Sequence, residues 1–180
     1  MAFEIETKIL DIDADEVKNN LILLGASKKQ ETRLFVDWYQ KIGTEEGSED
    51  WFLRIRSNSE GKHEVTWKAK SDIVGIARKH KEINFTIEES EKLVDLFLEL
   101  GLEKYARQEK DRTTFLSKDW QFDIDQYPGM PAFLEIEGKS EEHLREAIIL
   151  LALEGNKIWA KGERVLIQEV YQLNWHNMKF

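Results

Sequence analysis

The sequence contains no cysteine and only two prolines, Pro128 and Pro131. The absence of cysteine excludes disulfide bonds and thiolate metal sites, and it fits a reducing compartment. No apolar run approaches the roughly 20 residues that span a bilayer, and no basic segment precedes an apolar one at the N-terminus. We therefore expect a cytoplasmic protein that is not inserted in a membrane.

Histidine is also scarce, and the 26 lysines and arginines are outnumbered by 35 aspartates and glutamates. The four histidines are scattered without the spacing of metal ligands, which argues against a histidine metal site. Glycine-rich phosphate-binding loops are absent. The net charge of −9 argues against a surface that binds nucleic acid. It does not exclude an anionic ligand in a cleft, so the positions of the lysines and arginines matter more than their number.

The residues that are present favour one folded domain over residues 1–180. The chain is 41% hydrophobic and 11% aromatic, which is enough for a substantial core. A charged fraction of 34% exceeds the usual quarter or so. Core packing is favoured over base stacking for the tryptophans, because most of them fall on apolar faces of the expected elements; the six are Trp38, Trp51, Trp67, Trp120, Trp159 and Trp175.

Hydrophobic periodicity predicts a chain in which strands outnumber helices. Helices are expected from Asp13 to about Leu24, from Glu89 or Ser90 to about Leu100, from Ser140 to about Glu154, and in the tail 162–174. Strands are expected over 3–10, 33–42, 50–57, 62–70, 78–87, 104–117, 119–127 and 132–138. Strand follows strand through hairpins, so the fold class is α+β with a mostly antiparallel sheet. A sheet of this size can close into an eight-stranded barrel.

Charged residues recur at alternate positions within these strands. Alternate residues of a strand share one face, so each charge–x–charge motif makes that face ionic. The opposite face is apolar, and amphipathic helices are available to cover it from outside. The repeated motifs are Glu4-x-Glu6-x-Lys8, Arg54-x-Arg56, Lys68-x-Lys70, Arg78 with Glu82, Lys110-x-Arg112, Asp123-x-Asp125 and Glu135-x-Glu137.

This pattern has two structural interpretations. In an open sheet the charges form a solvated outer face, with repulsion between like charges offset by cross-strand pairs. In a closed barrel the ionic faces converge on a shared interior. Desolvating that many charges for stability alone would be costly, so a barrel of this kind implies a ligand. Arginine and lysine bind phosphate oxygens, whereas carboxylates prefer a hard cation such as Mg²⁺ or Mn²⁺. Together they suggest a metal–polyphosphate complex.

The ordered set of motifs resembles the CYTH superfamily, the triphosphate tunnel metalloenzymes. Glu4-x-Glu6-x-Lys8 matches the ExExK signature of that family, and the later motifs follow in the family's order through Glu135-x-Glu137. The resemblance covers nearly the whole chain. It implies a closed barrel with helices packed outside and a charged tunnel. The superfamily includes class IV adenylate cyclases, thiamine triphosphatases, inorganic triphosphatases and fungal-type RNA triphosphatases.

The resemblance also implies roles for individual residues. The metal, Mg²⁺ or Mn²⁺, would bind to carboxylates from the set Glu4, Glu6, Asp123, Asp125, Glu135 and Glu137. The triphosphate would bind to cations from the set Arg54, Arg56, Lys68, Lys70, Arg78, Lys110 and Arg112. Lys8 would lie near the reacting phosphate or the attacking group, and Glu82 would complete the catalytic residues.

Three positions are unusual or ambiguous. His80 stands where many members have an acid, two residues before Glu82. The lysine that the family places near the C-terminal end could be Lys157 or Lys161. Arg33 is expected at the surface, since a single charge in a strand usually faces solvent.

The leading functional hypothesis is metal-dependent hydrolysis of a small triphosphate: inorganic triphosphate, thiamine triphosphate or a nucleoside triphosphate. The alternatives are a class IV-like adenylate cyclase, which would form cyclic AMP and pyrophosphate, and a non-catalytic module that binds polyphosphate or nucleotide. The motifs barely separate the enzymes, and the sequence shows no base-recognition pocket. The resemblance leaves a homodimer open.

Overall fold

The structure is a computed structural model that describes residues 2–180. Its strands are β1 (Ala2–Ile9), β2 (Ser27–Lys41), β3 (Trp51–Asn58), β4 (His63–Ala69), β5 (Asp72–Val74), β6 (Ala77–Ile87), β7 (Leu102–Ser117), β8 (Trp120–Gln126), β9 (Phe133–Glu137), β10 (Ile158–Trp159) and β11 (Asn177–Met178). Its helices are α1 (Ala14–Leu23), α2 (Ser90–Glu99), α3 (Glu141–Leu150) and the short α4 (Glu163–Val165), which continues into a π-helical turn over Leu166–Val170.

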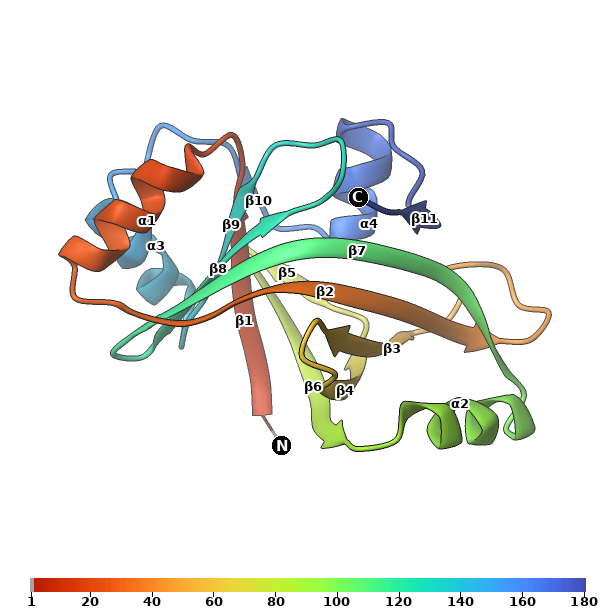
Figure 1. The fold of residues 1–180 in the computed structure, drawn as a ribbon. Coiled ribbons are helices and arrows are strands. Elements are labelled where there is room, and N and C mark those ends of the chain that lie inside the picture. The colour runs from red at the N-terminus through yellow and green to blue at the C-terminus, as the bar shows by residue number, and fades with distance from the viewer. Residues whose placement is uncertain (1) are drawn as a thin grey trace.

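Eight of these strands close into an antiparallel barrel. Neighbouring pairs run in the order β1, β9, β8, β7, β2, β3, β4 and β6, and β6 pairs with β1 to complete the circle. The long strands β2 and β7 cross much of the molecule side by side (Figure 1). The fold class and the closed barrel expected from the sequence are therefore confirmed.

The helices cover the outer, apolar face of the barrel. α1 and α3 lie together on one side of it (Figure 1), where Val17 and Leu21 of α1 share a core with Leu144 and Ile148 of α3 and with residues of the barrel wall. α2 packs elsewhere, with Phe97 against Tyr39. This arrangement leaves the ionic faces of the strands turned inward.

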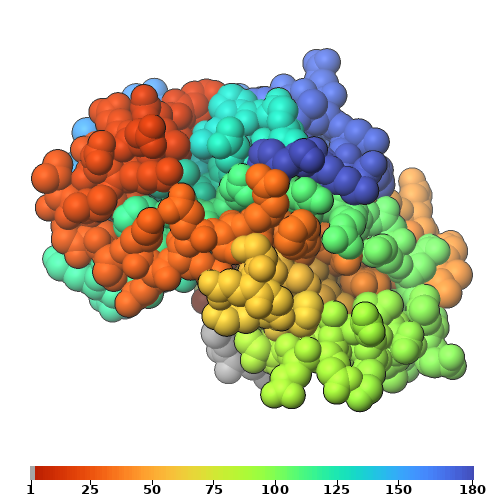
Figure 2. All heavy atoms as spheres, viewed as in Figure 1, coloured from red at the N-terminus to blue at the C-terminus, as the bar shows by residue number. Residues whose placement is uncertain are grey.

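The C-terminal segment forms a further core with the end of the barrel. Leu166 and Ile167 are fully buried there, beside Tyr127 and Trp175. β11 adds to β7 in parallel, and Figure 2 shows the dark blue C-terminal residues lying against the green residues of that strand. The tail is therefore an integral part of the wall.

Three expected boundaries differ from the structure. The helix predicted to reach about Glu154 ends at Leu150, because Ala152 takes a positive φ of 56° and turns the chain. The tail predicted as one helix over 162–174 is helical only over 163–170. The second strand begins at Ser27, six residues earlier than position 33, because β7 is long enough to pair with the whole extension.

Within residues 2–180, no helix is both long and apolar enough to cross a membrane.

The buried face of α3 should carry much of the stabilising contact between this helix and the barrel. Leu144 is fully buried, so Leu144→Ala should lower the free energy of unfolding by about 2–5 kcal/mol. Ile149 on the same helix is 61% exposed, and Ile149→Ala should change it by less than about 0.5 kcal/mol. Urea denaturation of both variants measures the difference; equal effects would contradict this packing.

Candidate functional site

A cavity of about 650 Å³ lies inside the barrel. Its volume falls in the range of about 300–1,000 Å³ typical of ligand sites. Most of the site residues predicted from the sequence line it: Glu4, Glu6, Lys8, Arg54, Arg56, Lys68, Lys70, Arg78, Glu82, Arg112, Asp123, Glu135 and Glu137. The alternation of charge along the strands therefore brings one wall of cations and one of acids into a common space.

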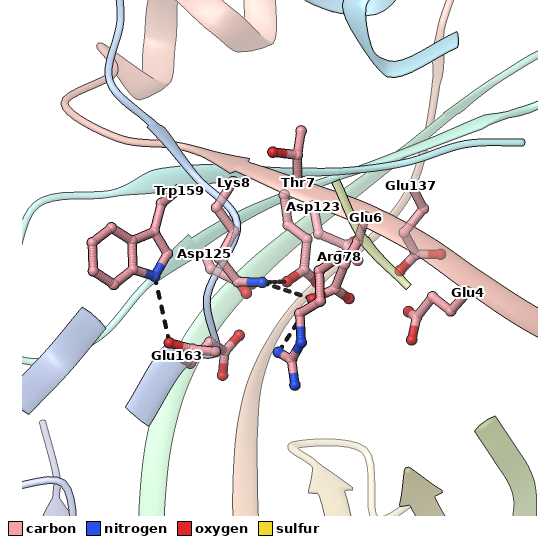
Figure 3. Close-up of polar contacts among 12 residues, drawn as sticks. Glu4, Glu6, Thr7, Lys8, Arg78, Asp123, Asp125, Glu137, Trp159 and Glu163 are labelled. Carbon is pink, nitrogen blue, oxygen red and sulfur yellow. Dashed lines mark hydrogen bonds and ion pairs between the residues drawn. The ribbon is translucent and has the colours of Figure 1, made fainter. Parts of the chain in front are cut away.

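Lys8 is held between two carboxylates at the centre of the acidic wall. Its Nζ lies 2.8 Å from Glu6 and 2.8 Å from Glu135, and its side chain is almost completely buried (Figure 3). Burial alone would lower the pKa of Lys8, but the charges of Glu135 and Glu6 outweigh it and raise the pKa. Lys8 is therefore a permanent cation and cannot act as a general base near neutral pH.

The carboxylates opposite Lys8 carry more negative charge than their neighbours neutralise. Register places Glu6 opposite Glu137 and Lys8 opposite Glu135. Oxygens of Asp123, Glu135 and Glu137 lie within 4.8 Å of one another. Burial, followed by the charges of Glu4, Glu135 and Asp123, raises the pKa of Glu137 to about 9. Glu4 and Glu137 face each other in Figure 3.

This donor set fits a hard divalent cation. Burial and the neighbouring acids favour the protonated form of Glu137, and a divalent cation would supply the compensating positive charge in place of that proton. All the ligands of the cluster are oxygens, which Mg²⁺ and Mn²⁺ prefer.

A second acidic group lies beside the first and includes a histidine. His80 pairs across strands with Glu4, and its Nε2 lies 2.5 Å from a Glu4 oxygen and 3.6 Å from Glu82. Lys68 bridges the same two acids at 2.6 and 2.8 Å. Burial opposes the charge of Glu82, but hydrogen bonds from His80 and the charge of Lys68 lower its pKa. Glu82 is thus ionised and a weak base.

His80 was not identified as a candidate from its sequence spacing. Oxygens of Glu4 and Glu6 and a ring nitrogen of His80 lie within 4.8 Å of one another, so this group could also hold a metal ion. The contact is made across strands β1 and β6, and sequence separation gives no sign of it.

The cations of the opposite wall differ in whether they already have partners. Arg112 is held by Asp123 and Asp125 at 2.7 and 2.5 Å. Arg56 pairs with Glu64. The side chain of Arg54, in contrast, forms no hydrogen bond or ion pair with any residue in 2–180, and its guanidinium carbon lies 5.6 Å from the centroid of the Trp38 ring. Arg54 is therefore the cation of this wall most available to an anionic ligand.

Two predicted site residues lie behind the cavity wall. Lys110 and Asp125 are fully buried, pair with each other at 2.8 Å, and are not part of the cavity surface formed by residues 2–180. Lys110 also contacts Glu163 at 2.8 Å, and Glu163 accepts a hydrogen bond from the Tyr127 hydroxyl. The geometry gives Lys110 and Asp125 a supporting position, with Glu163 between Lys110 and the cavity.

Lys70 lies at the rim, where its side chain is 71% exposed. Neither Lys157 nor Lys161 lines the cavity of the described chain; both are exposed and lie near the ring of Trp159. The C-terminal side chains that do line it are Glu163, Arg164, Val165 and Trp175. Arg33 is on the outside, paired with Asp111 at 2.8 Å, as expected.

Sequence reasoning missed the contribution of the C-terminal segment and of aromatic residues. Glu163, Arg164 and Trp175 reach the cavity through tertiary packing, and no local pattern marks them. Trp38 lies at even spacing from Leu34 and Val36 on β2, so strand alternation places it on the same face as Leu34, which also lines the cavity. Its neighbour Tyr39 packs in the outer core instead. A register irregularity between Trp38 and Tyr39 interrupts the alternation, and the sequence does not show that irregularity.

Comparison with known proteins yields relatives of the same architecture. A protein of Methanocaldococcus jannaschii named as a candidate adenylate cyclase is 30% identical over 137 residues, covering 74% of this chain and 75% of the relative. A Vibrio parahaemolyticus structure also named as a candidate adenylate cyclase matches with a TM-score of 0.77 at 13% identity, over 92% of this chain and 98% of the other.

A third match is HpAC1 from Hippeastrum, named for adenylyl cyclase and described as having a dominant triphosphatase activity. Its TM-score is 0.69 at 11% identity, over 94% of this chain and 96% of HpAC1. At these identities the two structural matches show a shared fold alone. The family model of the CYTH domain matches residues 2–158, and the chain therefore belongs to the CYTH domain family.

Proposed function

We propose that this protein hydrolyses the terminal phosphate of a small triphosphate in the presence of a divalent metal ion. The observation that carries the proposal is that two groups line the same cavity. One is Arg54, whose side chain has no ion-pair partner within residues 2–180, and the other is the carboxylate cluster of Asp123, Glu135 and Glu137, whose negative charge is only partly neutralised. A polyphosphate chain would face Arg54, Arg56 and Lys68, whereas a cation would lie against Glu135 and Glu137.

The residues of the cavity can supply positioning and charge, which are the main requirements of phosphoryl transfer. When bound, the metal ion would neutralise phosphate charge and polarise the phosphorus–oxygen bonds. Arg54 and Arg56 would bind non-reacting phosphoryl oxygens. Lys8 remains protonated and would stabilise charge on the reacting group. A carboxylate of the acidic wall would orient the attacking water, and a strong base is not required because the transition state is loose.

Class IV-like cyclisation of ATP is the second candidate, and the name of the archaeal relative favours it. The activity described for HpAC1 supports hydrolysis instead. The two reactions differ in the phosphorus attacked and in the attacking oxygen, so they are separated by their products rather than by the charged residues of the cavity.

Product analysis tests the proposal. Incubation with Mg²⁺ or Mn²⁺ and, in parallel, tripolyphosphate, thiamine triphosphate and ATP should release orthophosphate from at least one substrate. Glu135→Gln should reduce the rate at least about 100-fold, since it removes a carboxylate of the proposed metal site. Glu99→Gln, on the exposed side of α2, is the matched control and should retain activity. Cyclic AMP with pyrophosphate would establish the cyclase, and no turnover of any substrate would contradict both enzymes.

Thermal melting tests the metal site separately. Because burial and the neighbouring acids raise the pKa of Glu137 to about 9, Glu137→Gln should leave the melting temperature in EDTA unchanged or slightly higher. Mg²⁺ or Mn²⁺ should stabilise the wild-type protein, by about 2.7 kcal/mol at 100 times Kd, and should not stabilise the variant comparably. Equal stabilisation of both proteins would place the metal elsewhere.

Arg54 and Lys110 should respond differently to substitution. Arg54 has no carboxylate partner, so Arg54→Gln should preserve stability and lower kcat/KM about 10- to 100-fold by removing charge-assisted phosphate contacts. Lys110→Met would leave the buried Glu163 without its cationic partner and Asp125 with Arg112 alone, and should lower the free energy of unfolding by about 3–5 kcal/mol. Steady-state kinetics and urea denaturation distinguish these effects. A destabilised Arg54→Gln protein would contradict its assignment.

A further inference from the structure

The barrel interior contains two neighbouring acidic groups, and distances alone would let either of them hold a cation. One group consists of Asp123, Glu135 and Glu137, and the other combines Glu4 and Glu6 with His80. Within each group the ligand atoms lie within 4.8 Å of one another. Charge compensation separates the two groups, because a buried acid that already has a cationic partner gains less from a metal ion.

The first group lacks a cation at Glu137. Asp123 and Glu135 each lie against Arg112, at 2.7 and 3.1 Å. Glu137 forms no ion pair with any residue in 2–180, and its recorded side-chain donor is the neutral amide of Gln121 at 3.1 Å. One carboxylate of this group is therefore left for a cation that the protein does not supply.

Lys68 occupies the second group in the way that a metal ion would. Its Nζ lies 2.6 Å from Glu4 and 2.8 Å from Glu82, so it bridges two carboxylates on the paired strands β1 and β6. Glu6 is compensated as well, because Lys8 lies 2.8 Å from it. Each acid on this side of the cavity thus has a cationic partner from the protein itself, and a divalent cation would have to displace a lysine.

His80 fixes the orientation of the Glu4 carboxylate. Its Nε2 and the Nζ of Lys68 contact the same oxygen of Glu4, Oε2, at 2.5 and 2.6 Å. A carboxylate only accepts hydrogen bonds, so Nε2 carries the proton and has no lone pair to offer a metal ion. The His80 side chain is completely buried, which keeps water from this contact. Glu4 faces Glu137 across the cavity (Figure 3), so its other oxygen is the one available to the first group.

We infer that Lys68 and His80 fill the second acidic group in place of a metal ion, so that the cavity holds a single divalent cation, bound at Glu137 and its neighbours. The inference rests on the proposed function and sharpens it: one cation, not a pair, accompanies the triphosphate. Lys68 has three N–H donors and uses two on Glu4 and Glu82, so it can also contact a phosphate oxygen without leaving them. His80 is a positioning residue that acts on the cation through Glu4.

Counting bound ions tests the inference without requiring turnover. Mn²⁺ alone is titrated into the protein, and electron paramagnetic resonance of the free ion gives the number bound. The wild-type chain should bind one Mn²⁺ ion above the weak background of surface carboxylates. Glu137→Gln should weaken that ion at least about 10-fold, since it removes a ligand. His80→Gln keeps a hydrogen-bond donor toward Glu4 and should retain the ion. Two ions on the wild-type chain, no ion, or loss of the ion from His80→Gln would overturn the inference.

Two further variants should create the second metal site. Lys68→Gln removes the bridging ammonium, whereas His80→Glu adds a carboxylate beside Glu4, so each should bind a second Mn²⁺ ion, and either serves if the other fails to fold. Lys92→Gln is the matched control: it removes a lysine that pairs with Glu89 outside the barrel, and should keep one ion. A single ion on both cavity variants would overturn the inference. Hydrolysis with two ions on the wild-type chain would contradict this inference alone, and one ion without hydrolysis of any triphosphate would contradict the proposed function alone.

Discussion

The structure depends on charge compensation inside a closed barrel. Strand geometry turns every second residue inward, so the repeated charge–x–charge motifs place acids and bases in a space with little water. The interior is viable because most charges meet an opposite one, as Lys8 does between Glu6 and Glu135. The same closure turns the apolar face outward, and this explains why α1, α2 and α3 lie outside the barrel.

Charge compensation is incomplete at two places in the cavity, and the proposed metal and triphosphate sites lie at these places. Glu137 belongs to a group of acids that its neighbours cannot fully neutralise, whereas Arg54 lacks an acid partner in the described chain. A metal–triphosphate complex carries the complementary charges, positive toward the carboxylates and negative toward the arginine. The surrounding ion pairs hold these two groups in place, so binding would require little reorganisation of the wall.

Much of the wall could be predicted from the sequence because side-chain alternation in a strand is a local property. It correctly placed Glu4, Arg54, Lys68 and Glu135 in the cavity. Alternation could not distinguish Arg112, which lines the cavity, from Lys110, which lies behind Glu163. Glu163 belongs to a segment about 50 residues later in the chain, and it separates Lys110 from the cavity.

The remaining features are also tertiary in origin. His80 joins Glu4 only through the pairing of β1 with β6, and Trp175 reaches the cavity only because the C-terminal segment folds against β7. The spacing of histidines in the sequence therefore did not identify His80 as a candidate ligand. Assigning the tryptophans to the core did not reveal that Trp38 and Trp175 also line the cavity. The N-terminal ends of the helices were easier to predict than the C-terminal ends. N-caps such as Asp13 and Ser140 are local signals in the sequence, whereas the turn at Ala152 is not.

The central claim is that one cavity holds a divalent cation against the acidic wall and a triphosphate against Arg54. A crystal structure with Mn²⁺ and a non-hydrolysable triphosphate tests it most directly, because anomalous scattering locates the metal independently of the phosphates. The account predicts a manganese peak in contact with Glu135 or Glu137 and phosphate oxygens bound to the Arg54 guanidinium. A manganese site on the outer surface, or a triphosphate bound away from Arg54, would contradict it.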